Sequence, residues 1–295
     1  MNNEWQLTGK INPKQLTESR LQLHYGIQFI AATGSALAAP NPDYSHTSLG
    51  WNDKLKAFVG EPIKGNKIFS VALYPVSLTS FLLDEQDNQI TAVSLHQQTL
   101  AQAMNWHRQE IAKLGAEAEK VVFIDYPPDD FPDHPIARGT PFDASLSEPG
   151  RQELANYYAN TNLLLQEIVA EHKEASLIHI WPHHFDMATL ITLPDKHSQA
   201  EHGNEEGEMT VGVGMSPGDK SYDEPYWYVT PWPYPDTTNL PQLDGGGFWH
   251  TQHWVGAVLK ASQLTQESAS AQAKQVMVFL DSAVKASKAL LEAIV

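Results

Sequence analysis

The sequence predicts an α+β protein in which an antiparallel sheet is flanked by helices. Three observations lead to this class. Long segments carry apolar residues at helical spacing. Short runs between them alternate large apolar with small residues, as strands do. Finally, the order helix, three or four strands, helix occurs twice along the 295 residues.

The first half supplies two helices and several strands. One helix begins at Asn12, a capping residue followed by Pro13, and stops at Pro40. A second helix begins at about Thr99 and is capped by Gly115. We expect strands near 46–59, 67–83, 89–96 and 121–124.

The second half repeats this order after a connector rich in Pro and Asp. We therefore divide the chain into a half at 1–126, a connector at 127–147 and a half at 148–295, which together form one compact unit. Helices are expected at 148–172 and from about Ser270. Strands are expected near 177–193, 208–216, 225–232 and 248–260.

A helix–β-meander–helix unit duplicated within the chain would explain the repeated order. Phe69–Leu73 and Met209–Ser216 have the same parity, with large apolar residues at odd positions and small residues at even ones. Each strand would therefore present one apolar face and one bare face. The alternative is that this arrangement is common and the likeness is due to chance.

Composition excludes several classes of partner and site. The net charge of −16 disfavours nucleic acid and anionic membranes as partners. The chain has no cysteine, which excludes disulfides, thiolate metal sites and a cysteine nucleophile. No apolar run is long enough to span a membrane, and the first residues do not resemble a signal peptide. We expect a cytoplasmic protein.

The run Trp181-Pro182-His183-His184-Phe185-Asp186 is the strongest candidate for a functional site. If 177–193 is one strand, His184 and Asp186 share a face and lie roughly 6.5 to 7 Å apart. Imidazole and carboxylate groups bind metals and move protons near neutral pH. Alternatively, they are core polar groups that neighbouring residues satisfy.

A divalent metal such as zinc, iron or manganese could join this run to the strand that begins at Trp249. His184, Asp186 and His253 would hold the ion and leave a position for water. The mechanism would be metal-assisted hydrolysis, with His183 and Asp186 as catalytic residues. No His-Glu-x-x-His motif supports this site.

Aromatic residues indicate a pocket for a flat or sugar-like ligand. Tyr226 and Tyr228 share a strand face, and the bare Gly212 and Gly214 leave room for rings from a neighbouring strand. The rings could instead cover the glycines as core packing. The proposed ligand-binding residues are Trp181, Tyr226, Tyr228, Trp249, His250 and Trp254. Other histidines, including His24 and His107, look scattered, and His107 lies on the apolar face of its helix.

Three segments resemble a family of bacterial proteins catalogued as a domain of unknown function, DUF5996. These are Leu21–Gln28, Trp181–Ala188 with its central Phe185-Asp186, and Tyr226–Tyr228. The family tends to have smaller residues where this chain has His183 and His184. The resemblance therefore implies a shared role for Phe185 and Asp186 but none for the two histidines, and it brings no activity or cofactor.

These observations predict a small-molecule-binding protein or an enzyme whose site of His, Asp and aromatic residues lies in the second half. The alternative is a non-catalytic binding or assembly protein, such as a homo-oligomer, in which the His and Trp residues form a structural core. Nucleic acid and membranes are not expected partners.

Overall fold

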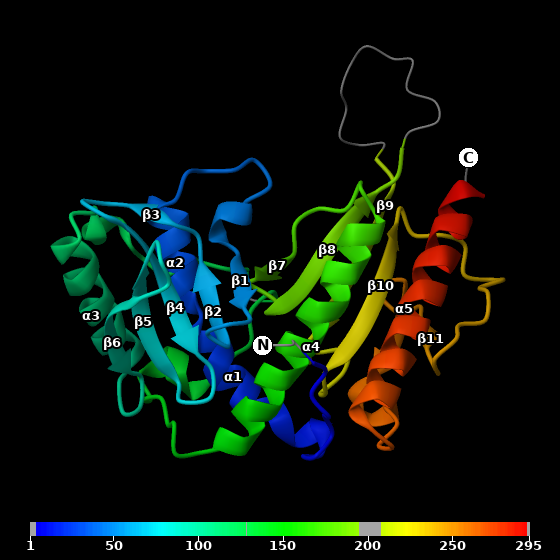
Figure 1. The fold of residues 1–295 in the computed structure, drawn as a ribbon, viewed down its shortest axis with the longest axis horizontal. Coiled ribbons are helices and arrows are strands. Elements are labelled where there is room, and N and C mark those ends of the chain that lie inside the picture. Colours follow the sequence, from blue (N-terminus) through cyan, green and yellow to red (C-terminus); the bar gives the residue numbers. More distant parts are fainter. Residues whose placement is uncertain (1–3, 128, 195–207, 294–295) are drawn as a thin grey trace, which may run out of the picture. The chain divides into compact units, whose positions relative to one another are not determined.

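The computed structural model describes residues 4–127, 129–194 and 208–293 and shows an α+β protein with helices flanking antiparallel sheet (Figure 1). The chain forms two compact units. We call the unit of Lys10–Ala159 and His179–Asp186 the histidine unit. We call the unit of Met1–Gly9, Asn160–Ile178 and Met187–Val295 the aromatic unit. None of the helices in the described ranges is long and apolar enough to cross a membrane.

The histidine unit is built on an antiparallel meander. Its strands follow the order β7 (His179–Trp181), β1 (Leu49–Asn52), β2 (Ala57–Gly60), β4 (Ile68–Tyr74), β5 (Thr79–Asp84) and β6 (Gln89–Ser94), and β3 (Ile63–Lys64) pairs with β4. The helices are α1 (Thr17–Gly26), α2 (Gln28–Leu37) and α3 (Leu100–Lys113), with short 3-10 turns at Pro13–Leu16, Ser45–Thr47, Ala118–Lys120 and Pro135–Arg138.

Local capping explains where these helices begin. The Asn12 side chain accepts a hydrogen bond from the backbone N–H of Lys14. Thr99 and Gln102 form a reciprocal capping box at the start of α3. Gly115 follows α3 with a φ of +79°, a conformation that favours glycine. The helix predicted from Asn12 to Pro40 is two consecutive helices that meet at Ile27.

The aromatic unit contains the remaining strands and the last helix. Its strands follow the order β11 (Phe248–His250), β12 (Gly256–Lys260), β10 (Tyr226–Trp232), β9 (Thr210–Ser216) and β8 (Asp186–Thr192), all paired antiparallel. A 3-10 turn at Ala261–Gln263 follows β12. Helix α5 (Ala269–Glu292) packs on β9, β10 and β12 (Figure 1). Helix α4 (Glu148–Glu171) enters this unit at Asn160.

The N-terminal segment of the aromatic unit is tied to α5 by one amide. The fully buried Gln272 donates from Nε2 to the Thr8 carbonyl at 2.9 Å and accepts at Oε1 from the Thr8 N–H at 3.0 Å. Its Oε1 also accepts from Trp5 Nε1 at 3.3 Å. Trp5 stacks on the buried Trp227 with 6.2 Å between ring centroids, so this segment contributes to the core.

Five predicted strands differ from the structure. The run 46–59 is two strands, β1 and β2, and the run 67–83 is also two, β4 and β5. The run 177–193 is two strands, because a turn at Pro182–Phe185 separates β7 from β8. The run 248–260 is also two, β11 and β12, with His253 between them at a φ of +70°. Residues 121–124 are not a strand, and the Val121 carbonyl accepts from the Arg108 guanidinium at 2.6 and 2.8 Å. The internal duplication stays a prediction.

Replacing Gly214 by alanine should destabilise the protein by about 1–3 kcal/mol, because the core has no room for the new methyl group. A Cβ at Gly214 would lie 2.6 Å from the Met187 carbonyl oxygen and 2.8 Å from Ala188 Cβ. Gly50→Ala is the matched control, since nothing lies within 4 Å of that Cβ, and it should stabilise its strand by about 0.5–1 kcal/mol. Urea unfolding of both variants checks the difference; equal effects would contradict it.

Candidate functional site

A buried hydrogen-bond network positions the turn Pro182–Phe185, which we call the histidine turn. The Pro182 carbonyl accepts from His24 Nε2 and from Gln28 Nε2, each at 2.9 Å. Because a carbonyl only accepts, His24 carries its proton on Nε2. The Tyr126 hydroxyl in turn donates to Gln28 Oε1 at 3.2 Å. Two helices thereby hold one carbonyl of the turn.

Phe185 closes the turn in a conformation that side chains rarely adopt. Its φ is +59°, yet the residue is fully buried. Its N–H donates to the Trp181 carbonyl at 2.7 Å, and its carbonyl accepts from the Tyr158 hydroxyl. The Phe185 ring lies 5.0 to 5.3 Å from the rings of Tyr158, His24 and Phe58. Backbone strain of this kind persists only where the surroundings enforce it, and it is concentrated at functional sites.

The turn leaves two histidines on the outside. His183 is half-buried and His184 is exposed, with 4.3 Å between their ring centroids. Burial lowers the pKa of His183 and the neighbouring His184 lowers it further, while Asp186 and Asp130 act in the opposite direction. His183 is therefore a neutral imidazole at pH 7, able to accept a proton or a hydrogen bond.

Aromatic residues surround His183. The Tyr126 and Trp181 rings lie 6.3 and 6.4 Å from its ring. Burial raises the pKa of Tyr126, so its hydroxyl stays protonated and keeps its bond to Gln28. Burial raises the pKa of Tyr158 well above its usual range, and the negative charge of Asp186 adds to this effect. Asp186 is half-buried at the start of β8, next to the turn.

The structure changes how the predicted histidine and aspartate residues are related. His184 and Asp186 do not share a face of one continuous strand, because His184 lies on the turn and Asp186 begins β8. Both belong to the histidine unit, whereas His253 belongs to the aromatic unit. Across the described residues, no group of three or more His, Cys, Asp or Glu side chains is placed to hold a metal ion. The metal site of His184, Asp186 and His253 stays a prediction.

Among the predicted ligand-binding residues, Tyr226, Tyr228, His250 and Trp254 belong to a cluster in the aromatic unit, whereas Trp181 lies beside His183 in the histidine unit. Strand register places Tyr228 opposite Gly214 and Tyr226 opposite Ser216, on the face away from Trp227. The Tyr228 hydroxyl lies 2.7 Å from where a Gly214 Cβ would be, so the glycine does leave room for a ring. Tyr226 donates to Asp219 Oδ2 at 2.6 Å, and its ring stacks with that of Trp254 at 6.5 Å.

His250 is held within this cluster. Its ring stacks on Trp254 with 4.3 Å between centroids, and its Nε2 donates to the Gln252 carbonyl at 2.6 Å. Its Nδ1 therefore accepts from the Tyr222 hydroxyl at 2.8 Å. Trp249 points to the opposite sheet face, since it pairs with Ala257, and donates from Nε1 to the Pro241 carbonyl at 2.8 Å. The rings stack on one another and their polar atoms have hydrogen-bond partners. This favours the interpretation of the cluster as core packing over that of an open ligand pocket.

Sequence reasoning missed the residues that support each cluster. His24 and Gln28 hold the histidine turn, and Tyr222 and Lys260 complete the aromatic cluster, with Lys260 Nζ 5.8 Å above the Tyr222 ring. His24 and Gln28 lie four residues apart, on one side of the helical segment, and both are buried. A polar pair at that spacing within an apolar helical stretch was the available signal.

Comparison with known proteins adds no relative. No family model matches the chain, and neither a curated protein nor a solved structure matches it.

Acid should destabilise the histidine unit through His24. Burial, the largest effect, lowers the pKa of His24 to about 3, whereas the unfolded chain has the ordinary value near 6.5. Between these values only the unfolded state takes up the proton, so the free energy of unfolding falls as pH falls, by roughly 5 kcal/mol in total. His24→Gln should flatten this slope in urea unfolding at pH 4.5 and 7. Gln28→Leu removes the other donor to the Pro182 carbonyl but no titrating group, so it should leave the slope unchanged. An unchanged slope in His24→Gln would contradict the assignment.

If His184, Asp186 and His253 form a metal site, protein purified without chelator should carry about one equivalent of zinc, iron or manganese. The His184→Ala variant should lose the ion, because two ligands hold a divalent metal weakly. Elemental analysis of both proteins checks this. A metal-free wild type, or a metal retained in His184→Ala, would reject this site.

Proposed function

We propose that the protein binds a small molecule at the histidine turn and that His183 accepts a proton or a hydrogen bond from it. The observation that carries this proposal is the strained turn itself. Its two internal carbonyls, those of Pro182 and Phe185, are held by buried side chains, and its histidines are directed outward. These bonds hold the backbone that carries both histidines in one conformation, which reduces the cost of binding a partner there.

The chemistry of the turn supports a ligand with an acidic N–H or O–H group. His183 is neutral at pH 7 and so offers a basic nitrogen. The adjacent His184 ring gives a second donor or acceptor within reach of the same molecule. Tyr126 and Trp181 add apolar ring surface beside His183. Ligand sites commonly combine apolar walls with a few fixed polar groups.

The resemblance to the DUF5996 family supports the same location. Leu21–Gln28 and Trp181–Ala188, two segments that carry the resemblance, contact each other through the bonds from His24 and Gln28 to the Pro182 carbonyl. We propose that Phe185 and Asp186 shape the turn in this chain and in the family it resembles. His183 and His184 would then determine which ligand this chain selects.

A fragment library screened by ligand-observed NMR tests the proposal. Fragments that bind the wild type should bind His183→Ala about tenfold more weakly, equivalent to about 1.4 kcal/mol. Their affinity should also fall at pH values below the pKa of His183, where the imidazole is charged. The control His96→Ala removes a half-buried histidine of the histidine unit that lies outside the turn and should bind normally. Fragments that bind wild type and His183→Ala equally would reject the site.

A further inference from the structure

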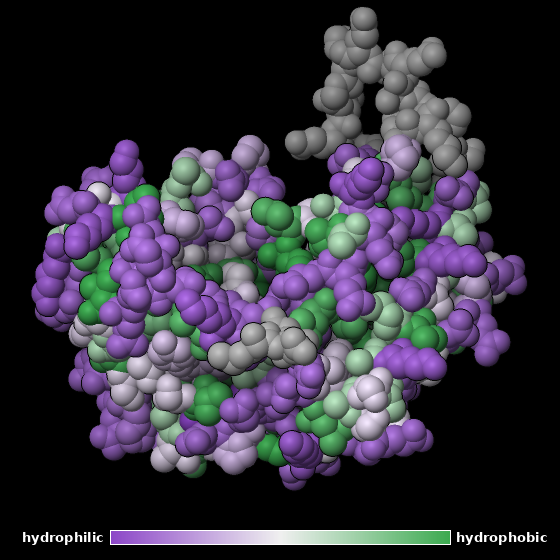
Figure 2. All heavy atoms as spheres, in the orientation of Figure 1, coloured by the Kyte–Doolittle hydropathy of each residue, from purple (hydrophilic) through white to green (hydrophobic). Residues whose placement is uncertain are grey.

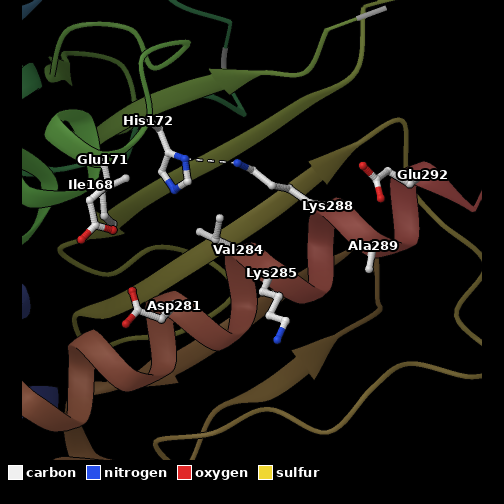
Figure 3. A pocket seen from close by; sticks show the side chains of 9 residues that line it. All are labelled: Ile168, Glu171, His172, Asp281, Val284, Lys285, Lys288, Ala289 and Glu292. Carbon is white, nitrogen blue, oxygen red and sulfur yellow. Dashed lines mark hydrogen bonds between the residues drawn. The ribbon is translucent and has the colours of Figure 1, made fainter. Parts of the chain in front are cut away.

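A hollow of about 530 Å³ lies in the aromatic unit, between the C-terminal end of α4 and the last turns of α5 (Figure 3). The outer face over α5 carries mostly hydrophilic residues (Figure 2). Ile168 and Val284 are buried and supply an apolar floor, and the rest of the lining consists of five charged side chains with His172 and Ala289. The hollow is thus a charged groove with an apolar floor, in a different unit from the histidine turn.

Three carboxylates line the hollow: Glu171 and Asp281 affect each other electrostatically, and Glu292 lies four residues after Lys288 on α5. Glu171 ends α4 and Asp281 projects from α5, and both line the hollow. Partial burial raises the pKa of Asp281, and the negative charge of Glu171 raises it further. Two carboxylates in mutual repulsion form an acidic end that a cation would relieve.

Lysines line the same hollow but do not neutralise these carboxylates. Lys285 and Lys288 both project from α5. Among the described residues, no ion pair of 4.0 Å or less joins either lysine to Glu171 or Asp281. Asp281 and Lys285 are four residues apart on one helix, a spacing at which opposite charges usually interact. The lysines therefore do not neutralise Glu171 or Asp281 by direct ion pairing.

Lys288 contacts a histidine instead of a carboxylate. Its Nζ donates to His172 Nδ1 at 3.2 Å, and the two side chains point toward each other from α5 and the end of α4 (Figure 3). Burial lowers the pKa of His172, and the positive charge of Lys288 lowers it further. His172 is therefore neutral and holds the lysine at the hollow without cancelling its charge.

We propose that this hollow binds a small zwitterion whose ammonium group lies between Glu171 and Asp281 and whose carboxylate contacts Lys288, the lysine that points toward His172 (Figure 3). Such a ligand would place a positive charge beside Glu171 and Asp281 and a negative charge beside Lys288. The apolar Ile168 and Val284 would contact the methylene chain between its charged groups. ω-Amino acids belong to this chemical class. The site is independent of the function proposed for the histidine turn.

A two-dimensional amide NMR titration tests the proposal with glycine, 4-aminobutanoate and 6-aminohexanoate as probes. Butylamine and butanoate, at matched ionic strength, each retain only one charge. At least one zwitterion should bind about tenfold more tightly than both singly charged probes. The shifted amides should lie at 168–172 and 281–292. Equal affinity for all probes, or shifts confined to other residues, would overturn the proposal.

Charge-neutral variants locate the two ends. Glu171→Gln and Lys288→Met should each weaken binding of the best zwitterion about tenfold. Glu167→Gln and Lys274→Met are matched controls, because both residues are exposed on the same two helices and do not line the hollow. Circular dichroism establishes that each variant is folded. Losses of equal size in the controls would show only a general effect of net charge and would overturn the site.

The pKa of the His172 imidazole reports on the position of the ligand's carboxylate, which a general effect of net charge would not do. The charged groups that act on it are Lys288, Glu171, Glu174 and Asp281. A bound carboxylate would neutralise Lys288, the group that most lowers the pKa after burial. The pKa of His172, followed by its ring C–H resonance, should therefore rise when the zwitterion saturates the protein. A pKa that is unchanged or lowered would overturn the placement of the carboxylate.

Discussion

The need to satisfy one buried carbonyl, that of Pro182, organises the histidine unit. An unpaired carbonyl in a protein core costs about as much as the hydrogen bond it lacks. His24 at the end of α1 and Gln28 at the start of α2 both meet this need, although they lie more than 150 residues away in the chain. The turn can therefore keep its conformation only while the first two helices are packed. The directions of His183 and His184 depend on contacts that neither residue makes.

Histidines serve two purposes in this molecule, and burial separates them. His24 and His107 are almost fully enclosed, and burial lowers the pKa of His107 to about 4. Each uses ring nitrogens to satisfy core groups; His107 lies between Ser80 Oγ at 2.7 Å and the Ala103 carbonyl at 2.8 Å. His183 reaches the surface and keeps a lowered pKa without being enclosed. That combination leaves a neutral imidazole available to a ligand.

Features that depend on neighbouring residues could be predicted from the sequence, whereas features that depend on distant residues could not. The cap at Asn12 depends on a residue two positions away and was predicted, as was the start of a helix at about Thr99. The α+β class and the room at Gly214 followed from strand alternation. The break at Pro182–Phe185 was missed because the positive φ of Phe185 is enforced by Tyr158 and His24, which adjacent residues cannot reveal. His183 and His184 could be selected as a site by residue type, but the network beneath them could not. Likewise, no spacing rule could pair strands well enough to test a metal site shared with His253.

The bond network of Gln272 has a consequence for folding during synthesis. Thr8 and Gln272 are 264 residues apart, so the N-terminal segment of the aromatic unit waits for its partner for roughly 13 to 53 s at 5–20 residues per second. For most of that interval Trp227 has not been synthesised, so the Trp5 ring cannot stack on it. The histidine unit is interrupted in a similar way, since His179–Asp186 is made well after Ala159. Neither unit can be completed while the first half alone has left the ribosome. The apolar surface that these late segments cover therefore stays exposed for most of the chain's translation.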